Sequence, residues 1–216
     1  VINQPSKTVV IAGGAKVSDK INALKQFVQA GVKTIFIGGK MANTFLIAQK
    51  ARIKMIPFKL SDIPRTLLSS SEESNKNLVN EVSLAGEILD FANDKKVNLI
   101  FPDDYKCVDE FKAPTFFIEA EPDFEKVLQL DLGPKTIENF KNTILSDGVE
   151  NVFWNGPLGA YDHPTNHDYA EGSLALAQLL FEETLTNQNF SAVIGGGDSA
   201  AILNKISSNQ LKNLIK

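Results

Sequence analysis

Short runs of β-branched and aromatic residues recur along the chain and alternate with longer segments of helical periodicity. The apolar runs occupy residues 8–11, 34–37, 98–101, 151–154 and 192–194. Runs this short and nearly continuous are typical of strands buried on both faces of a sheet. We therefore expect five core strands at these positions.

Between these runs, apolar residues recur every three or four positions, as on one face of a helix. This spacing covers residues 20–30, 74–93, 135–145 and 168–184. Gly31 follows the first segment and is a suitable helix stop. Alternating strands and helices predict βαβ units with right-handed crossovers and a parallel sheet. The expected fold is α/β, a Rossmann-like three-layer αβα arrangement with a mainly parallel sheet.

One segment breaks this alternation. Within residues 103–121, the stretches 105–111 and 115–119 predict a small antiparallel excursion. Residues 57–74 are polar and contain a serine run, which indicates a surface loop rather than a domain linker. We therefore expect one domain over residues 1–216.

Composition excludes several classes of protein. Of 216 residues, 43% are hydrophobic and 22% charged, as in ordinary globular proteins, and the net charge of −4 argues against a nucleic-acid partner. No apolar run approaches the roughly 18 residues of a membrane span. Cys107 is the single cysteine, so an internal disulfide is impossible, and two histidines leave little room for a zinc site. We expect a cytoplasmic protein in a reducing compartment.

Glycines gather where four of the expected strands end. Nine of the 14 glycines fall in the clusters Gly13–Gly14, Gly38–Gly39, Gly156 with Gly159, and Gly195–Gly197. Ligands of open parallel sheets bind outside the carboxyl ends of the strands, so these clusters should converge on one site. Backbone N–H groups freed there suit phosphate oxygens. The alternative is that each glycine only makes a tight turn.

Two familiar phosphate motifs do not fit. No G-x-x-x-x-G-K-[ST] occurs, which excludes a P-loop protein. Residues 195–200 match G-x-G-x-x-[GA], but they follow the last expected strand, and the chain ends before an acidic residue could close a dinucleotide-binding unit. A dinucleotide site is therefore not favoured.

Charged residues accompany the glycines. Lys16 and Lys20 share a helix face if a helix begins near Lys16. Two ammonium groups oppose the helix dipole, so their placement indicates an anionic ligand. Asp198 follows three glycines. It either caps the next helix or holds Mg²⁺ together with phosphate oxygens.

Five motifs together resemble the nucleotide-binding domain of the phosphoglycerate kinase family. They are VIAGGAKVSDKI at residues 10–21, IGGKMA at 37–42, LDLGPKT at 130–136, FWNGPLGAYD at 153–162 and IGGGDSA at 194–200. All five stand in the family's order with compatible spacing. The resemblance implies reversible phosphoryl transfer between 1,3-bisphosphoglycerate and ADP, which gives 3-phosphoglycerate and MgATP in glycolysis.

The resemblance also implies a set of nucleotide-binding residues. They are Gly13, Gly14, Ala15, Lys16, Lys20, Gly38, Gly39, Leu130, Asn155, Pro157, Gly159, Ala160, Asp162, Gly196, Gly197, Asp198 and Ser199.

Particular roles within this set follow from the same resemblance. Lys16, Lys20 and Gly197 are the catalytic group, which neutralises and holds the phosphates. Asp198 is the ligand of the Mg²⁺ that accompanies ADP or ATP. Gly38 and Gly39 form the adenine slot with Leu130 against the base or ribose. Asp162 stands where the family has a glutamate that contacts the ribose hydroxyls.

Phosphoryl transfer requires positioning and charge neutralisation rather than a protein nucleophile. The aromatic residues near the motifs, Phe36, Trp154 and Tyr161, lie near the ends of expected strands, where aromatic residues are more often part of the core; we expect them to be core residues rather than stacking partners.

The sequence departs from the family pattern in three ways. The family's amino-terminal substrate domain and its carboxy-terminal tail have no counterpart, so we expect a monomeric nucleotide-binding domain that is inactive alone. The missing domain would bind 3-phosphoglycerate. Lys40 and Gln129 replace glycines that border the adenine site, and their bulk would narrow it. A non-catalytic or degenerate nucleotide-binding module is the alternative function; no nucleic-acid or membrane partner is expected.

Overall fold

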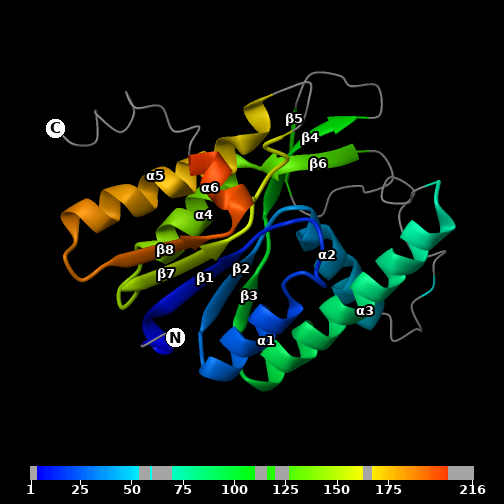
Figure 1. The fold of residues 1–216 in the computed structure, drawn as a ribbon, viewed down its shortest axis with the longest axis horizontal. Helices are drawn as coiled ribbons and strands as arrows, with labels where there is room; N and C mark the ends of the chain where they lie inside the picture. Colours follow the sequence, from blue (N-terminus) through cyan, green and yellow to red (C-terminus); the bar gives the residue numbers. More distant parts are fainter. Residues whose placement is uncertain are drawn as a thin grey trace.

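A five-stranded parallel sheet forms the centre of the protein. The computed structural model describes residues 4–53, 59, 70–109, 116–119, 127–162 and 167–203. The strands follow one another across the sheet in the order β3-β2-β1-β7-β8 (Figure 1). Their bounds are Thr8–Ala12 for β1, Thr34–Ile37 for β2, Asn98–Ile100 for β3, Asn151–Asn155 for β7 and Ser191–Gly195 for β8. All five predicted strands are confirmed, each within one residue at either end.

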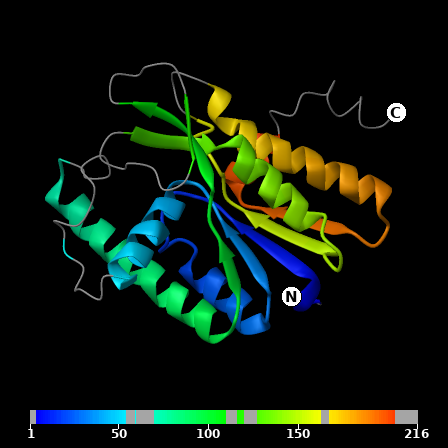
Figure 2. The same ribbon diagram turned by 180° about the vertical axis from the view of Figure 1, so that it is seen from behind.

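Helices cover both faces of this sheet. One face carries α1 (Ile21–Ala30), α2 (Lys40–Ile53) and α3 (Glu72–Asp94), and the other carries α4 (Pro134–Ile144) and α5 (Glu171–Thr186), as Figures 1 and 2 show. Successive strand residues pack into two separate hydrophobic cores. Val10 packs on the face covered by α1, α2 and α3, and Ile11 packs on the face covered by α4 and α5. The three-layer arrangement is therefore confirmed. The remaining helical elements are η1 (Pro5–Lys7), η4 (His167–Ala170) and α6 (Gly197–Leu203).

Local sequence signals explain three of the helix ends. Gly31 closes α1 in a left-handed conformation, with φ of 89°, as its position after the apolar stripe predicts. The Ser71 hydroxyl accepts a hydrogen bond from the N–H of Ser74 and caps α3. Pro134 occupies the first turn of α4, where its missing N–H costs nothing.

Helix α2 was not predicted, and its environment explains why. Residues 41–48 are all buried. A helix enclosed on all sides has no polar face, so it lacks the periodicity that marks an amphipathic helix.

The antiparallel excursion is confirmed and is larger than expected. Strand β4 (Asp104–Asp109) lies between β5 (Phe116–Glu119) and β6 (Val127–Leu132), and both pairings are antiparallel. Strand β6 was missed, although V-L-Q-L-D-L alternates apolar and polar residues as strands do. This small sheet stands beside the carboxyl end of the parallel sheet (Figure 1).

Two further points concern the described part of the chain. No described helix is both long enough and apolar enough to cross a bilayer. The polar stretch 57–74 lies mostly outside the described residues, and its last three residues already belong to α3.

Candidate functional site

The four glycine clusters meet at one edge of the parallel sheet. They follow β2, β1, β7 and β8, which are neighbours in the strand order, and the order reverses between β1 and β7. The loops are bonded to one another: the N–H of Gly13 donates to the Asn155 carbonyl at 2.9 Å, and the N–H of Met41 donates to the Gly14 carbonyl at 3.0 Å. The predicted convergence is therefore confirmed at the switch point, where such sheets bind ligands.

Close packing requires glycine at two of these loops. A Cβ atom at Gly13 would collide with the carbonyl oxygens of Gly156 and Pro157. A Cβ atom at Gly39 would collide with the backbone of Gly14 and with the Pro157 carbonyl. Gly197, in contrast, has open space around it. Gly196 has a φ of 94°, which favours glycine, so the tight-turn alternative accounts for much of the glycine pattern but not for Gly197.

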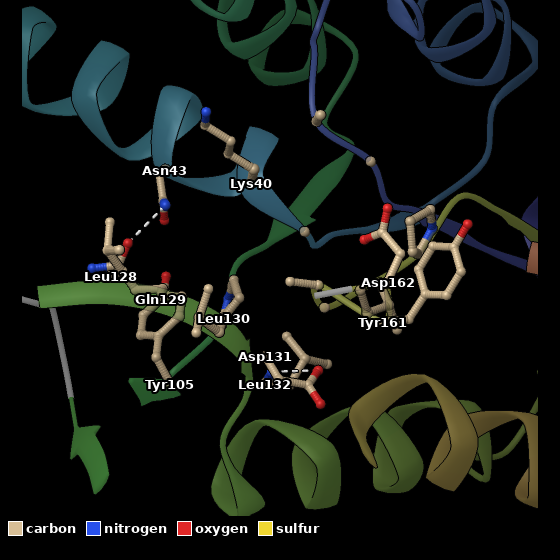
Figure 3. A pocket seen from close by; sticks show the side chains of 18 of the residues that line it. Lys40, Asn43, Tyr105, Leu128, Gln129, Leu130, Asp131, Leu132, Tyr161 and Asp162 are labelled. Carbon is tan, nitrogen blue, oxygen red and sulfur yellow. Dashed lines mark hydrogen bonds between the residues drawn. The ribbon is translucent and has the colours of Figure 1, made fainter. Parts of the chain in front are cut away.

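A cleft of about 440 Å³ opens in front of these loops, and its volume suits a ligand of nucleotide size (Figure 3). We call the loops after β1, β2, β7 and β8, with Asp198, the glycine-loop side, and β6 with Asn43 and Tyr105 the β6 side. The predicted residues that line the cleft are Gly14, Ala15, Gly39, Leu130, Pro157, Gly159, Ala160, Asp162 and Asp198.

The other predicted residues lie outside this lining. Gly13 and Gly38 are buried behind it, and Gly196 and Gly197 are exposed beside it. Lys16 is exposed and lines a neighbouring cavity that shares Ala15, Lys40 and Asn43 with the cleft.

The helix expected near Lys16 begins later. Helix α1 starts at Ile21, with Lys20 at its N-cap, because the buried side chain of Val17 anchors a turn in which the Lys20 N–H donates to the Val17 carbonyl. Lys16 and Lys20 therefore do not share a helix face, and that expectation was wrong. The Nζ of Lys20 donates a hydrogen bond to Oδ1 of Asn155, which places this ammonium group at the loop after β7.

Asp198 is exposed in the first turn of α6, which begins at Gly197, so it does not cap this helix. Its Oδ1 accepts a hydrogen bond of 3.1 Å from the Tyr161 hydroxyl. Desolvation, the bond to Asp198 and the charges of Asp198 and Asp162 raise the pKa of Tyr161. Ser199 is buried, and its hydroxyl accepts the N–H of Gly156 at 2.8 Å, which ties α6 to the loop after β7.

The carboxylates of the cleft suit Mg²⁺ held jointly with phosphate. Among the described residues, no group of three histidine, cysteine or acidic side chains gathers into an all-protein metal site. Asp198 and Asp162 both line the cleft. Magnesium is commonly bound through one or two carboxylates plus phosphate oxygens, so this donor set fits the metal of a nucleotide complex.

A buried carboxylate on the β6 side was not assigned a role from the sequence. Asp131 accepts hydrogen bonds from the N–H groups of Leu132 at 2.8 Å and Gly172 at 3.0 Å. Burial raises its pKa to about 6, and the two N–H groups, followed by the nearby Lys106 ammonium, partly oppose this shift. Lys106 itself is buried and lies 2.9 Å from Glu171. The alternation of apolar and polar residues along β6 was the signal that could have identified Asp131.

The aromatic residues divide between core and cleft. Phe36 and Trp154 are fully buried, and Phe36 stacks on Phe140 with ring centroids 3.9 Å apart, which confirms their core role. Tyr161 lines the cleft, so its assignment to the core was wrong. Lys40 and Gln129 both border the cleft as expected, and the Lys40 side chain extends away from β6 (Figure 3).

Comparison with known proteins agrees with this architecture. A family model described as phosphoglycerate kinase matches residues 1–214. The cytosolic phosphoglycerate kinase of Trypanosoma congolense is 37% identical over 201 residues, which are 92% of this chain and 42% of that protein. The phosphoglycerate kinase of Chlorobium phaeobacteroides (strain BS1) is 34% identical over 209 residues, 94% of this chain and 45% of that protein.

A solved structure shows the same similarity in three dimensions. The phosphoglycerate kinase from Coxiella burnetii matches with a TM-score of 0.70 at 25% identity, over 98% of this chain and 47% of that one. The chain thus spans less than half the length of these relatives.

Proposed function

Because the chain belongs to the phosphoglycerate kinase family, we propose that it is the nucleotide-binding part of an enzyme that transfers a phosphoryl group between 1,3-bisphosphoglycerate and ADP. The convergence of four glycine loops on one cleft carries this proposal. The substrate acid would be bound by the part of the relatives that this chain does not span.

The glycine-loop side supplies what phosphoryl transfer requires of a protein. The transferring group carries dispersed negative charge, so catalysis depends on alignment and neutralisation. Lys16 and Lys20 follow the glycines of the first loop and supply positive charge. The backbone N–H groups of Gly196 and Gly197 would donate to phosphate oxygens, and the exposed Asp198 carboxylate would hold the Mg²⁺.

The opposite wall of the cleft is suited to a nucleoside. Leu128 and Leu130 of β6 present apolar surface to the cleft, which suits the faces of a base. Asp162 lines the same cleft and would accept hydrogen bonds from ribose hydroxyls. One ligand could therefore place its base against β6 and its phosphates against the glycine loops.

Calorimetric titration of the 216-residue chain with MgADP tests nucleotide binding. We expect saturable binding, and no detectable heat at millimolar nucleotide with a folded sample would contradict the proposal. Turnover needs both reactants held in line, so the chain alone should not convert 3-phosphoglycerate and ATP.

Adding the remainder of the enzyme in trans separates the catalytic from the non-catalytic interpretation. Recovered turnover in a coupled NADH assay would support the kinase. Nucleotide binding without recovered turnover would favour the non-catalytic module. We also propose a monomer that works in the cytoplasm; among the relatives of Trypanosoma congolense, one is cytosolic and another glycosomal.

A further inference from the structure

Asp131 lies where β6, the loop after β7 and α5 meet. It follows Leu130 on β6, is 3% exposed and lines the cleft. In Figure 3 it lies between Leu130 on one side and Tyr161 and Asp162 on the other. One carboxylate therefore borders both the surface offered to a base and the loop that would contact a ribose.

The carboxylate caps α5 although it comes from another element. Helix α5 begins at Glu171 after Ala170, whose side chain offers no acceptor, so the first N–H groups of this helix need partners from elsewhere. Oδ2 of Asp131 accepts the N–H of Gly172 at 3.0 Å, and Oδ1 accepts the N–H of Leu132 at 2.8 Å. Asp131 thus holds the start of α5 against β6.

The same carboxylate sets how closely the loop after β7 approaches β6. A Cβ atom at Gly159, which lies in this loop, or at Gly172 would collide with Oδ1 of Asp131, so both glycines pack directly on the carboxylate. The next residue of the loop is also bonded to β6, because the N–H of Ala160 donates to the Leu130 carbonyl at 2.7 Å. The distance between β6 and the loop therefore depends on the space that this carboxylate occupies.

This distance is important for a nucleoside because its two halves would contact opposite walls. The base would lie against Leu130, and the ribose would reach Asp162 in the loop after β7. We propose that Asp131 is a positioning residue, which sets the affinity for the nucleoside by fixing the spacing of these two walls. The inference rests on the proposed function, because it requires the cleft to bind a nucleotide.

The phosphate end of the nucleotide should not respond to this spacing. The phosphates would be held by Lys16, Gly196 and Gly197, which follow β1 and β8 rather than the strand whose loop packs on Asp131. Walls that already have the correct spacing bind without an ordering cost, whereas loosened walls must be ordered by the ligand. Loss of the carboxylate should therefore weaken binding of a whole nucleotide and spare that of pyrophosphate.

Asp131→Asn tests the proposal, because it keeps the side-chain volume and replaces one acceptor oxygen by a donor that faces an N–H group. Calorimetry with ADP in excess Mg²⁺, and displacement of ADP by pyrophosphate, measure the two affinities. A pH of about 8 keeps the carboxyl of the unmodified chain ionised, since its pKa is about 6. We expect the dissociation constant of ADP to rise about tenfold and that of pyrophosphate to change less than about twofold.

A second variant reaches the carboxylate from outside the cleft. Gly172→Ala places a Cβ atom 2.8 Å from Oδ1 of Asp131, and residue 172 does not line the cleft, so the change should displace the carboxylate without touching a ligand. It should weaken ADP binding by at least about threefold and spare pyrophosphate, which preserves the test if Asp131→Asn does not fold. Val28→Ala is the control for lost stability: Val28 is a buried core residue of α1 outside the cleft lining, and its variant should change neither affinity.

The outcomes separate this inference from the proposed function. Equal loss of affinity for ADP and pyrophosphate in folded Asp131→Asn or Gly172→Ala, or no loss of either, would overturn the inference and leave the proposed function intact. A preferential loss of ADP binding in Val28→Ala, or failure of pyrophosphate to displace ADP from the unmodified chain, would also overturn it. If the folded, unmodified chain did not bind ADP, the proposed function itself would fail.

Discussion

The two sides of the cleft are formed by different chemical groups. The glycine-loop side consists of backbone from four loops, with exposed charges at Lys16 and Asp198. The β6 side consists of side chains, among them the buried polar groups of Asn43 and Asp131. Backbone N–H groups match phosphate oxygens whatever the base is, whereas buried side chains respond to the shape and polarity of one ligand. We therefore expect the glycine-loop side to provide affinity for phosphate and the β6 side to provide selectivity.

The largest expected effect tests whether the loops of the glycine-loop side form one packed unit. Gly13→Ala should destabilise the fold by about 3 kcal/mol, because the new Cβ meets two backbone carbonyls that cannot rotate away. Urea unfolding measures the change. Gly197→Ala is the matched control: its Cβ enters open space and alanine favours helices, so the free energy of unfolding should change by less than about 1 kcal/mol. Equal losses in both variants would contradict this account.

The next effect concerns Asp131, the buried carboxylate of the β6 side. Burial raises the pKa of Asp131 from 3.8 to about 6, so the folded state binds this proton more tightly than the unfolded state. The resulting stability is fully present below about pH 4 and is lost as the pH rises through 6. A shift of this size corresponds to on the order of 3 kcal/mol as an upper bound.

Chemical unfolding at intervals from pH 4 to 8 measures this contribution. Asp131→Asn should lose the corresponding part of the pH dependence, while Lys106 and Glu171, the charged groups that face Asp131, remain in place. Parallel stability curves for the two proteins would contradict the assignment of this proton to Asp131.

A smaller effect tests whether Asp198, on the glycine-loop side, holds Mg²⁺. Asp198→Ala should weaken MgADP binding by about tenfold and should change ADP binding in EDTA by less than about twofold. Since Asp198 is not the N-cap of α6, the free energy of unfolding should change little. Calorimetry with and without EDTA, together with urea unfolding, provides both measurements. An equal loss of affinity in the presence and absence of Mg²⁺ would remove Asp198 from the metal site.

The smallest effect concerns the contact between Tyr161 and Asp198. Tyr161→Phe removes one exposed hydrogen bond and keeps the ring in the cleft wall, so MgADP affinity should fall by less than about threefold. Tyr161→Ala also removes apolar lining and should cost more. If the two variants behaved alike, the hydroxyl rather than the ring would be the important part of this residue.

The sequence by itself determined the parallel sheet and the site's location. Buried strands such as residues 34–37 have an unmistakable composition, and the glycines after them mark the ends where parallel strands place their ligands. These are local properties, so they can be found without knowledge of contacts. The charged residues beside the glycines were found in the same way, although the start of α1 at Ile21 depended on the burial of Val17.

Only the tertiary structure decided which side chains share the β6 side. Asn43 and Gln129 are 86 residues apart, and their hydrogen bond depends on how α2 packs beside an antiparallel sheet. Residues 41–48 of α2 are all buried, so the sequence does not indicate that one polar residue of the first turn faces a cleft. The raised pKa of Asp131 likewise arises from burial by segments distant in sequence. Pairings between distant residues and the desolvation they cause follow from packing, which local sequence patterns do not encode.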